Sequence, residues 1–215
     1  MRVPLKVGAV AACVALIAVG CSSGSSGKSA TPTTSGQAAI VWPAPANPLA
    51  LARAAGLRPE PAEQLQFHVH AEVDVFVNGQ QVVVPAGLGI DTTNPRVHVF
   101  PDDPPGSGAT GYGGIVVPCD KPCISPLHTH DVTGTIHTES STAKLNTLGQ
   151  LFIEWDVKLD RSCVNTYCEP KAPIAIYVNG KKFSGDPRQI PLSNYEEIAV
   201  VIGTPPAHIP SKVSF

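Results

Sequence analysis

The chain has 215 residues, of which 43% are hydrophobic and 15% are charged, and its formal net charge is −2 at pH 7 with neutral histidines. Its 15 lysine and arginine residues are outnumbered by 17 acidic residues, so there is no basic excess to neutralise nucleic-acid phosphates. The composition therefore argues against a nucleic-acid partner.

The first 20 residues have the features of a secretory signal peptide. Arg2 and Lys6 precede an apolar run at residues 7–19, which is short for a membrane span. The motif Ala18-Val19-Gly20-Cys21 then resembles a bacterial lipobox, although leucine is usual three positions before the cysteine. We therefore expect lipidation of Cys21 and anchoring on the extracytoplasmic face of the cell membrane. Ordinary cleavage nearby, which would leave Cys21 as a free thiol, is the alternative.

Residues 21–46 are mostly Ser, Gly, Thr, Pro and Ala and have little to bury. They are expected to form a disordered tether between the lipid anchor and the domain. The remaining residues, 47–215, are sufficient for one domain with a single hydrophobic core. A short helix should open this domain at residues 47–56, with Asn47 as its N-cap, Pro48 in the first position and Gly56 as its stop.

The first strong strand pattern is Phe67–Val77, in which apolar and polar residues alternate. The odd positions are all apolar and predict a core-facing surface. The even positions place polar side chains on the opposite face, with Phe76 the exception: His68, His70, Glu72 and Asp74. The dipeptide Asn78-Gly79 then predicts a tight hairpin to a second strand.

Four cysteines belong to the domain: Cys119, Cys123, Cys163 and Cys168. Outside the cytoplasm two disulfides are the default, and sequence alone allows three connectivities. Because each pair is close in sequence and lies in a turn-prone segment, local bonds Cys119–Cys123 and Cys163–Cys168 are favoured. A zinc site formed by the four thiolates is the alternative, although the spacings are not Cys-x-x-Cys.

A second histidine motif, at residues 127–139, predicts a β-hairpin around the turn-forming Asp131–Gly134. With a loop of two or four residues, His128 lies directly opposite His137, and His130 lies on the same face as His128. Directly opposed Cβ atoms are about 4.5–5.5 Å apart, which allows two imidazoles to bind one ion. A three-residue loop would change the register and separate them.

Further along, residues 147–155 predict a helix capped by Thr147, and Asn179-Gly180 predicts another hairpin. The last clear strand is at residues 197–202. Together these elements predict a mainly β fold, a single β-sandwich or open-barrel-like domain with one or two short helices.

Four sequence motifs between Phe67 and Gly203 are similar to those of a known protein family. They are Phe67-His68-x-His70 with Val77-Asn78-Gly79, the run Leu127-His128-Thr129-His130-Asp131 through Ile136-His137-x-Glu139-Ser140, Thr147-Leu148-Gly149-Gln150-Leu151-Phe152, and Val178-Asn179-Gly180-Lys181 through Ile190-Pro191-Leu192. They resemble the motifs of a family of small secreted or lipid-anchored bacterial proteins. The resemblance implies a shared architecture and a shared set of histidines, but no particular activity. Many members carry a histidine near the position of Asn194, which this chain lacks.

The two strand motifs together predict one metal site with five candidate ligands: His68, His70, His128, His130 and His137. Glu72, Asp131 or Glu139 could accept hydrogen bonds from these imidazoles and fix their tautomers. Neutral imidazoles suit Cu(II) or Zn(II), whereas the lack of methionine after Met1 argues against a thioether site for Cu(I).

We therefore expect a lipid-anchored metal-binding protein that acts as a buffer, carrier or sensor. One alternative is a cupin-like metalloenzyme, although Glu139 follows His130 at a longer spacing than cupins have. Another is a tethered protein- or glycan-binding module whose histidines only tune its surface. His98 is a possible further ligand or a surface residue, and His208 is expected to face solvent. The sequence indicates no particular protein partner.

Overall fold

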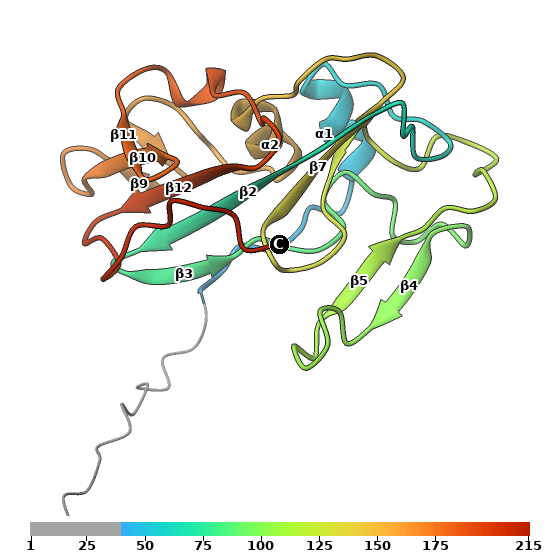
Figure 1. Cartoon of the computed structure of the whole chain (residues 1–215), viewed down its shortest axis with the longest axis horizontal. Coiled ribbons are helices and arrows are strands. Elements are labelled where there is room, and N and C mark those ends of the chain that lie inside the picture. The colour runs from blue at the N-terminus through green and yellow to red at the C-terminus, as the bar shows by residue number, and fades with distance from the viewer. Residues whose placement is uncertain (1–39) are drawn as a thin grey trace, which may run out of the picture. The chain divides into compact units, whose positions relative to one another are not determined.

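A computed structural model of the protein describes residues 40–215 (Figure 1). The expected signal peptide, the lipidation site at Cys21 and most of the expected tether lie outside the described residues. The described part is mainly β, with two short α-helices and sheets that are not closed. The alternating patterns of the sequence thus predicted the fold class correctly.

The main sheet has eight strands, and six of them form its principal path. In spatial order these are β1 (Ile40–Val41), β3 (Gln80–Val83), β2 (Phe67–Val77), β12 (Glu196–Ile202), β10 (Ile174–Val178) and β11 (Lys181–Phe183). Two more strands extend the sheet beside β2: β7 (Thr135–Ser140) pairs with β2, and β6 (Leu127–His128) pairs with β7.

The long strand β2 runs through the middle of this sheet (Figure 1). Its first half pairs antiparallel with β7, its last three residues pair antiparallel with β3, and β12 lies parallel along its other edge. Hairpins at Asn78-Gly79 and Asn179-Gly180 join β2 to β3 and β10 to β11, as predicted. Both turns have positive φ at both central residues, which asparagine and glycine adopt at low cost.

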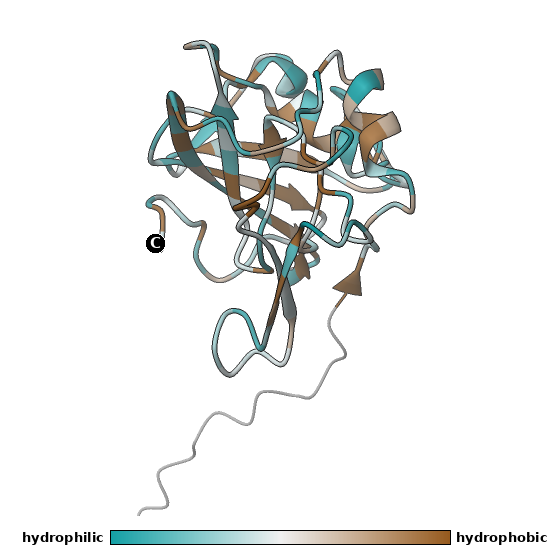
Figure 2. Ribbon diagram, turned by 90° about the vertical axis from the view of Figure 1, so that its right-hand side faces the viewer, coloured by the Kyte–Doolittle hydropathy of each residue, from teal (hydrophilic) through white to brown (hydrophobic). Residues whose placement is uncertain are grey.

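One face of the sheet packs against α2 (Leu148–Glu154), and α1 (Pro48–Ala54) packs in turn against α2. The predicted cap of α2 is present, because Thr147 and Gln150 form a reciprocal capping box. Buried side chains of α2 and of the strands form one large hydrophobic cluster, which includes Phe152, Trp155 and Val75. Hydrophobic residues, brown in Figure 2, accordingly gather on the strands at the centre of the domain.

The folded unit begins earlier than the composition suggested. Strand β1 pairs parallel with β3, and the side chain of Trp42 is buried beside Trp155 with ring centroids 5.6 Å apart. The indole N–H of Trp155 also donates a hydrogen bond to the carbonyl of Trp42. Ile40 and Trp42, which the composition placed in the tether, therefore contribute to the core.

Two smaller hairpins stand apart from the main sheet, formed by β4 (His98–Pro101) with β5 (Thr110–Gly113) and by β8 (Cys163–Val164) with β9 (Tyr167–Cys168). A 3₁₀ turn, η1, spans Pro187–Gln189. Both disulfides are the local ones, Cys119–Cys123 and Cys163–Cys168. The four cysteines therefore do not form a common zinc site.

The second face of the main sheet is covered in part by the last residues of the chain. Phe76, Ala199 and Val201 form a small buried cluster there, and Ile209 packs against it. No helix within residues 40–215 is long and apolar enough to cross a membrane.

Candidate metal centre

Three histidines lie in one row across three adjacent strands. His128 of β6 is paired with His137 of β7, and His137 is paired with His70 of β2. The first pairing is the register predicted from the hairpin. The second pairing is a long-range contact that brings the two histidine motifs together. Because paired residues point to the same face, all three imidazoles project from one side of the sheet.

The next row along the same face contains His68 and Glu139, which are also paired. The Oε1 atom of Glu139 lies 3.1 Å from Nε2 of His68, 3.4 Å from Nδ1 of His137 and 3.8 Å from Nε2 of His128. The carboxylate is 4% exposed and is shared among three imidazoles. Glu139 thus has a more central position than the supporting role expected for it, and it could itself bind a metal ion.

His130 reaches the same cluster from a loop and not from the strand that the sequence predicted, since β6 ends at His128. Its ring centroid lies 4.8 Å from that of His128 and 4.3 Å from that of His137. The loop backbone is held by β5, because the amide of Tyr112 donates to the carbonyl of His130. All five predicted histidines are therefore brought together.

Backbone carbonyls determine the tautomers of two of these imidazoles. Nδ1 of His128 lies 2.9 Å from the carbonyl oxygen of Ser125, and Nδ1 of His130 lies 2.6 Å from that of Tyr112. A carbonyl oxygen only accepts hydrogen bonds, so each Nδ1 must carry a proton and donate it. The lone pair of each ring is then on Nε2, as in many metal-binding histidines held by a second hydrogen bond.

Three buried polar atoms of the cluster form no well-aligned hydrogen bond within residues 40–215: Nε2 of His128, Nδ1 of His137, which has only the 3.4 Å approach to Glu139 Oε1, and Oε2 of Glu139. An unsatisfied buried polar atom costs about 1–3 kcal/mol, so three in one place require a reason. Single ligand atoms of His128, His130, His137 and Glu139 all lie within 4.8 Å of one another. Three imidazoles and one carboxylate match the donor types of a bound transition metal, and the ion would satisfy these atoms.

The surroundings of His70, His128 and His137 lower their pKa values and favour the neutral imidazoles. Burial lowers the pKa of His128 to about 3, and the neighbouring His130 adds to the effect. Burial, followed by repulsion from His137 and His68, lowers the pKa of His70 to about 4. Burial alone would raise the pKa of Glu139, but the nearby His137, His128 and His68 lower it to about 2. Neutral imidazoles beside an ionised carboxylate are the protonation states that bind metal.

One side of the cluster opens toward solvent. His68 is 38% exposed, whereas His128 is fully buried. Nε2 of His68 lies 2.7 Å from Nε2 of His70, and these two form a second close grouping with His137. The ring of Phe215 packs edge to face against the ring of His70, with centroids 5.6 Å apart. The histidines thus form a continuous series from the surface to the buried end.

The backbone of His70 is held by the segment for which the family resemblance suggested a histidine. The amide of His70 donates to the side-chain oxygen of Asn194, and the amide of Tyr195 donates to the carbonyl of His70. This segment therefore adjoins the cluster, although its side chains here are not imidazoles.

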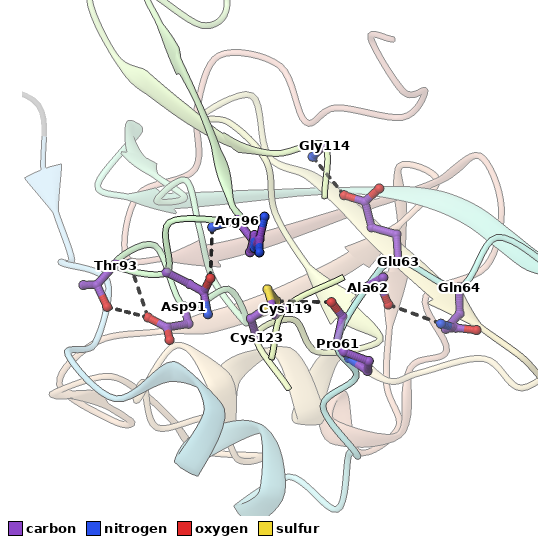
Figure 3. The surroundings of a disulfide bond; sticks show 11 residues. Pro61, Ala62, Glu63, Gln64, Asp91, Thr93, Arg96, Gly114, Cys119 and Cys123 are labelled. Carbon is purple, nitrogen blue, oxygen red and sulfur yellow. Dashed lines mark hydrogen bonds between the residues drawn. A yellow bond between two sulfur atoms is a disulfide. The ribbon is translucent and has the colours of Figure 1, made fainter. Parts of the chain in front are cut away.

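A small second core supports His130. The disulfide Cys119–Cys123 belongs to this core, against which Tyr112 packs. Figure 3 shows the surroundings of the disulfide, where the amide of Gly114 donates to the carboxylate of Glu63. These contacts hold the end of β5, and with it the Tyr112 carbonyl that orients His130.

Other candidate residues lie elsewhere. Asp131 accepts hydrogen bonds from the amide and hydroxyl of Thr133 and so stabilises the turn, not the imidazoles. Glu72 belongs to a separate group of carboxylates on the same face of the sheet. His98 stacks on Phe100 in the β4–β5 hairpin, and His208 is exposed. The contacts of the Ser125 and Tyr112 carbonyls with His128 and His130 could not be predicted. Every residue has a backbone carbonyl, and the sequence does not show which of them meet the imidazoles.

Comparison with protein families, with curated proteins and with solved structures finds no match for this chain.

Proposed function

We propose that this protein is a lipid-anchored, extracytoplasmic metal-binding protein, whose ion is held by His128, His130, His137 and Glu139. The observation that carries the proposal is a group of buried ligand atoms that form no well-aligned hydrogen bond within the described part of the chain, namely His128 Nε2, His137 Nδ1 and Glu139 Oε2. A bound cation would satisfy all of them at once. The lipid anchor rests on the lipobox-like motif at Cys21.

The graded exposure of the histidines supports a role as buffer or carrier. The exposed His68 and the half-buried His70 would receive a hydrated ion first. The buried His128, His137 and Glu139 would then replace its remaining water ligands. Because the deeper ligands are less accessible, they would hold the ion more tightly than His68 and His70.

The donor set favours Zn(II) or Cu(II). Imidazole nitrogen suits both ions, and a carboxylate oxygen completes a four-ligand zinc site. Cu(II) has the higher intrinsic affinity for such sites, so selection between the two in the cell would depend on which ion is available.

Metal analysis of the purified, untagged protein tests this proposal. We expect about one or more equivalents of Zn or Cu, lost on treatment with a strong chelator and regained on addition of the ion. A protein- or glycan-binding module with incidental histidines would contain no stoichiometric metal. A screen for hydrolytic and oxidative activities of the metal-loaded protein separates a carrier from an enzyme.

A further inference from the structure

A second polar cluster lies on the same face of the sheet, beyond the histidines. Glu72 and Asp74 are alternate residues of β2, and Glu197 of β12 is paired with Glu72 in the parallel register. The three side chains therefore project from one face. All three are buried, with exposures of 5% for Glu72, 8% for Asp74 and 1% for Glu197.

The hydrogen bonds of this cluster are incomplete. Glu72 accepts from the amide and hydroxyl of Ser214, and Asp74 accepts from the side-chain amide of Gln81 at 2.7 Å. Both carboxylate oxygens of Glu197 are buried and accept no hydrogen bond from an N–H or hydroxyl group among residues 40–215, and the carboxyl group of Asp74 is their near neighbour. None of the ion pairs found among residues 40–215 involves any of the three carboxylates.

Three ionised carboxylates in a buried site repel one another and cost several kcal/mol of desolvation, unless one of them is protonated or a positive charge accompanies them. A metal ion can supply this charge. Single oxygen atoms of Glu72, Asp74 and Glu197 lie within 4.8 Å of one another. Ligand oxygens on opposite sides of a Ca²⁺ ion, each about 2.3–2.6 Å from it, are about 5 Å apart, so this spacing fits.

We propose that Glu72, Asp74 and Glu197 form a binding site for Ca²⁺, separate from the histidine centre. All the donors are carboxylate oxygens, the ligands that hard cations prefer, and there is no imidazole to favour Zn(II) or Cu(II). Ca²⁺ also accepts irregular geometry and water ligands, whereas Mg²⁺ demands a near-ideal octahedron. The contact of Ser214 with Glu72 places the end of the described chain over this site.

The test uses protein stripped of metal with a chelator, then titrated calorimetrically with Ca²⁺ at constant ionic strength and pH 7.5. We expect one equivalent of Ca²⁺ to bind and to raise the melting temperature, with a smaller effect of Mg²⁺ at the same concentration. In Glu197→Gln the affinity for Ca²⁺ should fall at least tenfold. The matched control is Glu196→Gln, since Glu196 is adjacent in β12 but on the opposite face of the sheet.

Two further variants keep the result interpretable. His128→Ala should retain the full Ca²⁺ affinity, which separates this site from the proposed transition-metal centre. Asp74→Asn should lose Ca²⁺ affinity as Glu197→Gln does. Agreement between the two variants shows that the loss does not come from a folding defect in one of them. If Asp74 and Glu197 instead share a proton, the wild-type protein will show neither Ca²⁺ binding nor a thermal shift. That result, or equal affinities for the wild-type and Glu197→Gln proteins, would overturn the proposal.

Discussion

His128 and His137 are directly opposite each other in neighbouring strands, with ring centroids 5.4 Å apart and ring planes inclined by only 14°. His137 is in turn opposite His70 in the next strand. The spacing of the imidazoles is therefore set by the hydrogen-bonded register of the sheet. A centre built in this way is preorganised, so little ordering of side chains should be needed when an ion binds.

The metal-free protein should lose stability as the pH falls from about 6.5 toward 4. Buried His128 has a folded-state pKa of about 3, so below pH 6.5 the unfolded chain binds a proton there that the folded chain does not. Stability contributed by the neutral imidazole is therefore present above pH 6.5 and lost on acidification. For this one group, the free energy of unfolding should fall by up to roughly 1.4 kcal/mol per pH unit.

Urea denaturation of chelator-treated protein at pH 5 and pH 7 measures this loss. His128→Gln should reduce the difference in the free energy of unfolding between pH 5 and pH 7. His208→Ala, at an exposed histidine, should leave this difference unchanged. An equal pH dependence in the wild-type and His128→Gln proteins would show that His128 is not kept neutral by burial.

Gly113→Ala should weaken metal binding without changing any candidate ligand. A Cβ atom on Gly113 would lie 2.3 Å from Nδ1 of His130, and the residue has a φ of +148°. The added methyl group must displace the imidazole from the carbonyl of Tyr112. Loss of such an orienting contact typically costs about 10–100-fold in metal affinity.

Gly106→Ala is the matched control for this substitution, because Gly106 also has a positive φ but a Cβ atom there would meet nothing within 4 Å. Calorimetric titration with Zn(II) should find near wild-type affinity for Gly106→Ala and weaker binding for Gly113→Ala. If both variants bind equally well, the position of His130 does not matter for the centre.

The two disulfides should differ in their influence on metal binding. Each closes a short loop, with sequence separations of 4 and 5, so its entropic contribution should be below the roughly 3 kcal/mol of a 15-residue loop. Only Cys119–Cys123 belongs to the core that supports Tyr112. Replacing both of its cysteines by serine should lower metal affinity, whereas the same change at Cys163 and Cys168 should not. Calorimetric titration of both double variants with Zn(II) checks this prediction, and an equal loss of metal affinity in the two would contradict it.

Much of the local structure could be predicted because it follows from adjacent residues. The Asn-Gly turns, the Thr147 cap and the facing of His128 and His137 depend on short-range geometry that the sequence displays directly. Burial of Trp42 was missed, because a single aromatic residue in a Pro- and Ala-rich stretch does not reveal a partner such as Trp155 more than 100 residues away.

The remaining features of the centre depend on long-range pairing. The pairing of β2 with β7 brings His68 beside Glu139, and no local pattern specifies which strands become neighbours. The pairing of β2 with β12 likewise brings Glu197 beside Glu72. Asp131 was expected near the imidazoles from its position in the motif, but its side chain is used by the turn that it caps.

The anchoring proposal predicts that Cys21→Ser releases the protein from the membrane fraction. Cys21 would carry the lipid, and serine at this position does not accept it. The domain should be unaffected, because residues 40–215 contain the whole of the described core. Membrane fractionation with circular dichroism of the released protein checks both points. A Cys21→Ser protein that still sediments with membranes as firmly as the wild type would contradict the lipid anchor.

The central claim is that His128, His130, His137 and Glu139 bind one metal ion, and calorimetric titration of Zn(II) and Cu(II) into single-alanine variants tests it most directly. We predict that His128→Ala and His137→Ala lower the affinity at least tenfold, about 1.4 kcal/mol, while His98→Ala and His208→Ala leave it unchanged. Equal affinities for the His128→Ala and His208→Ala variants, or no binding of either ion to the wild-type protein, would contradict the account.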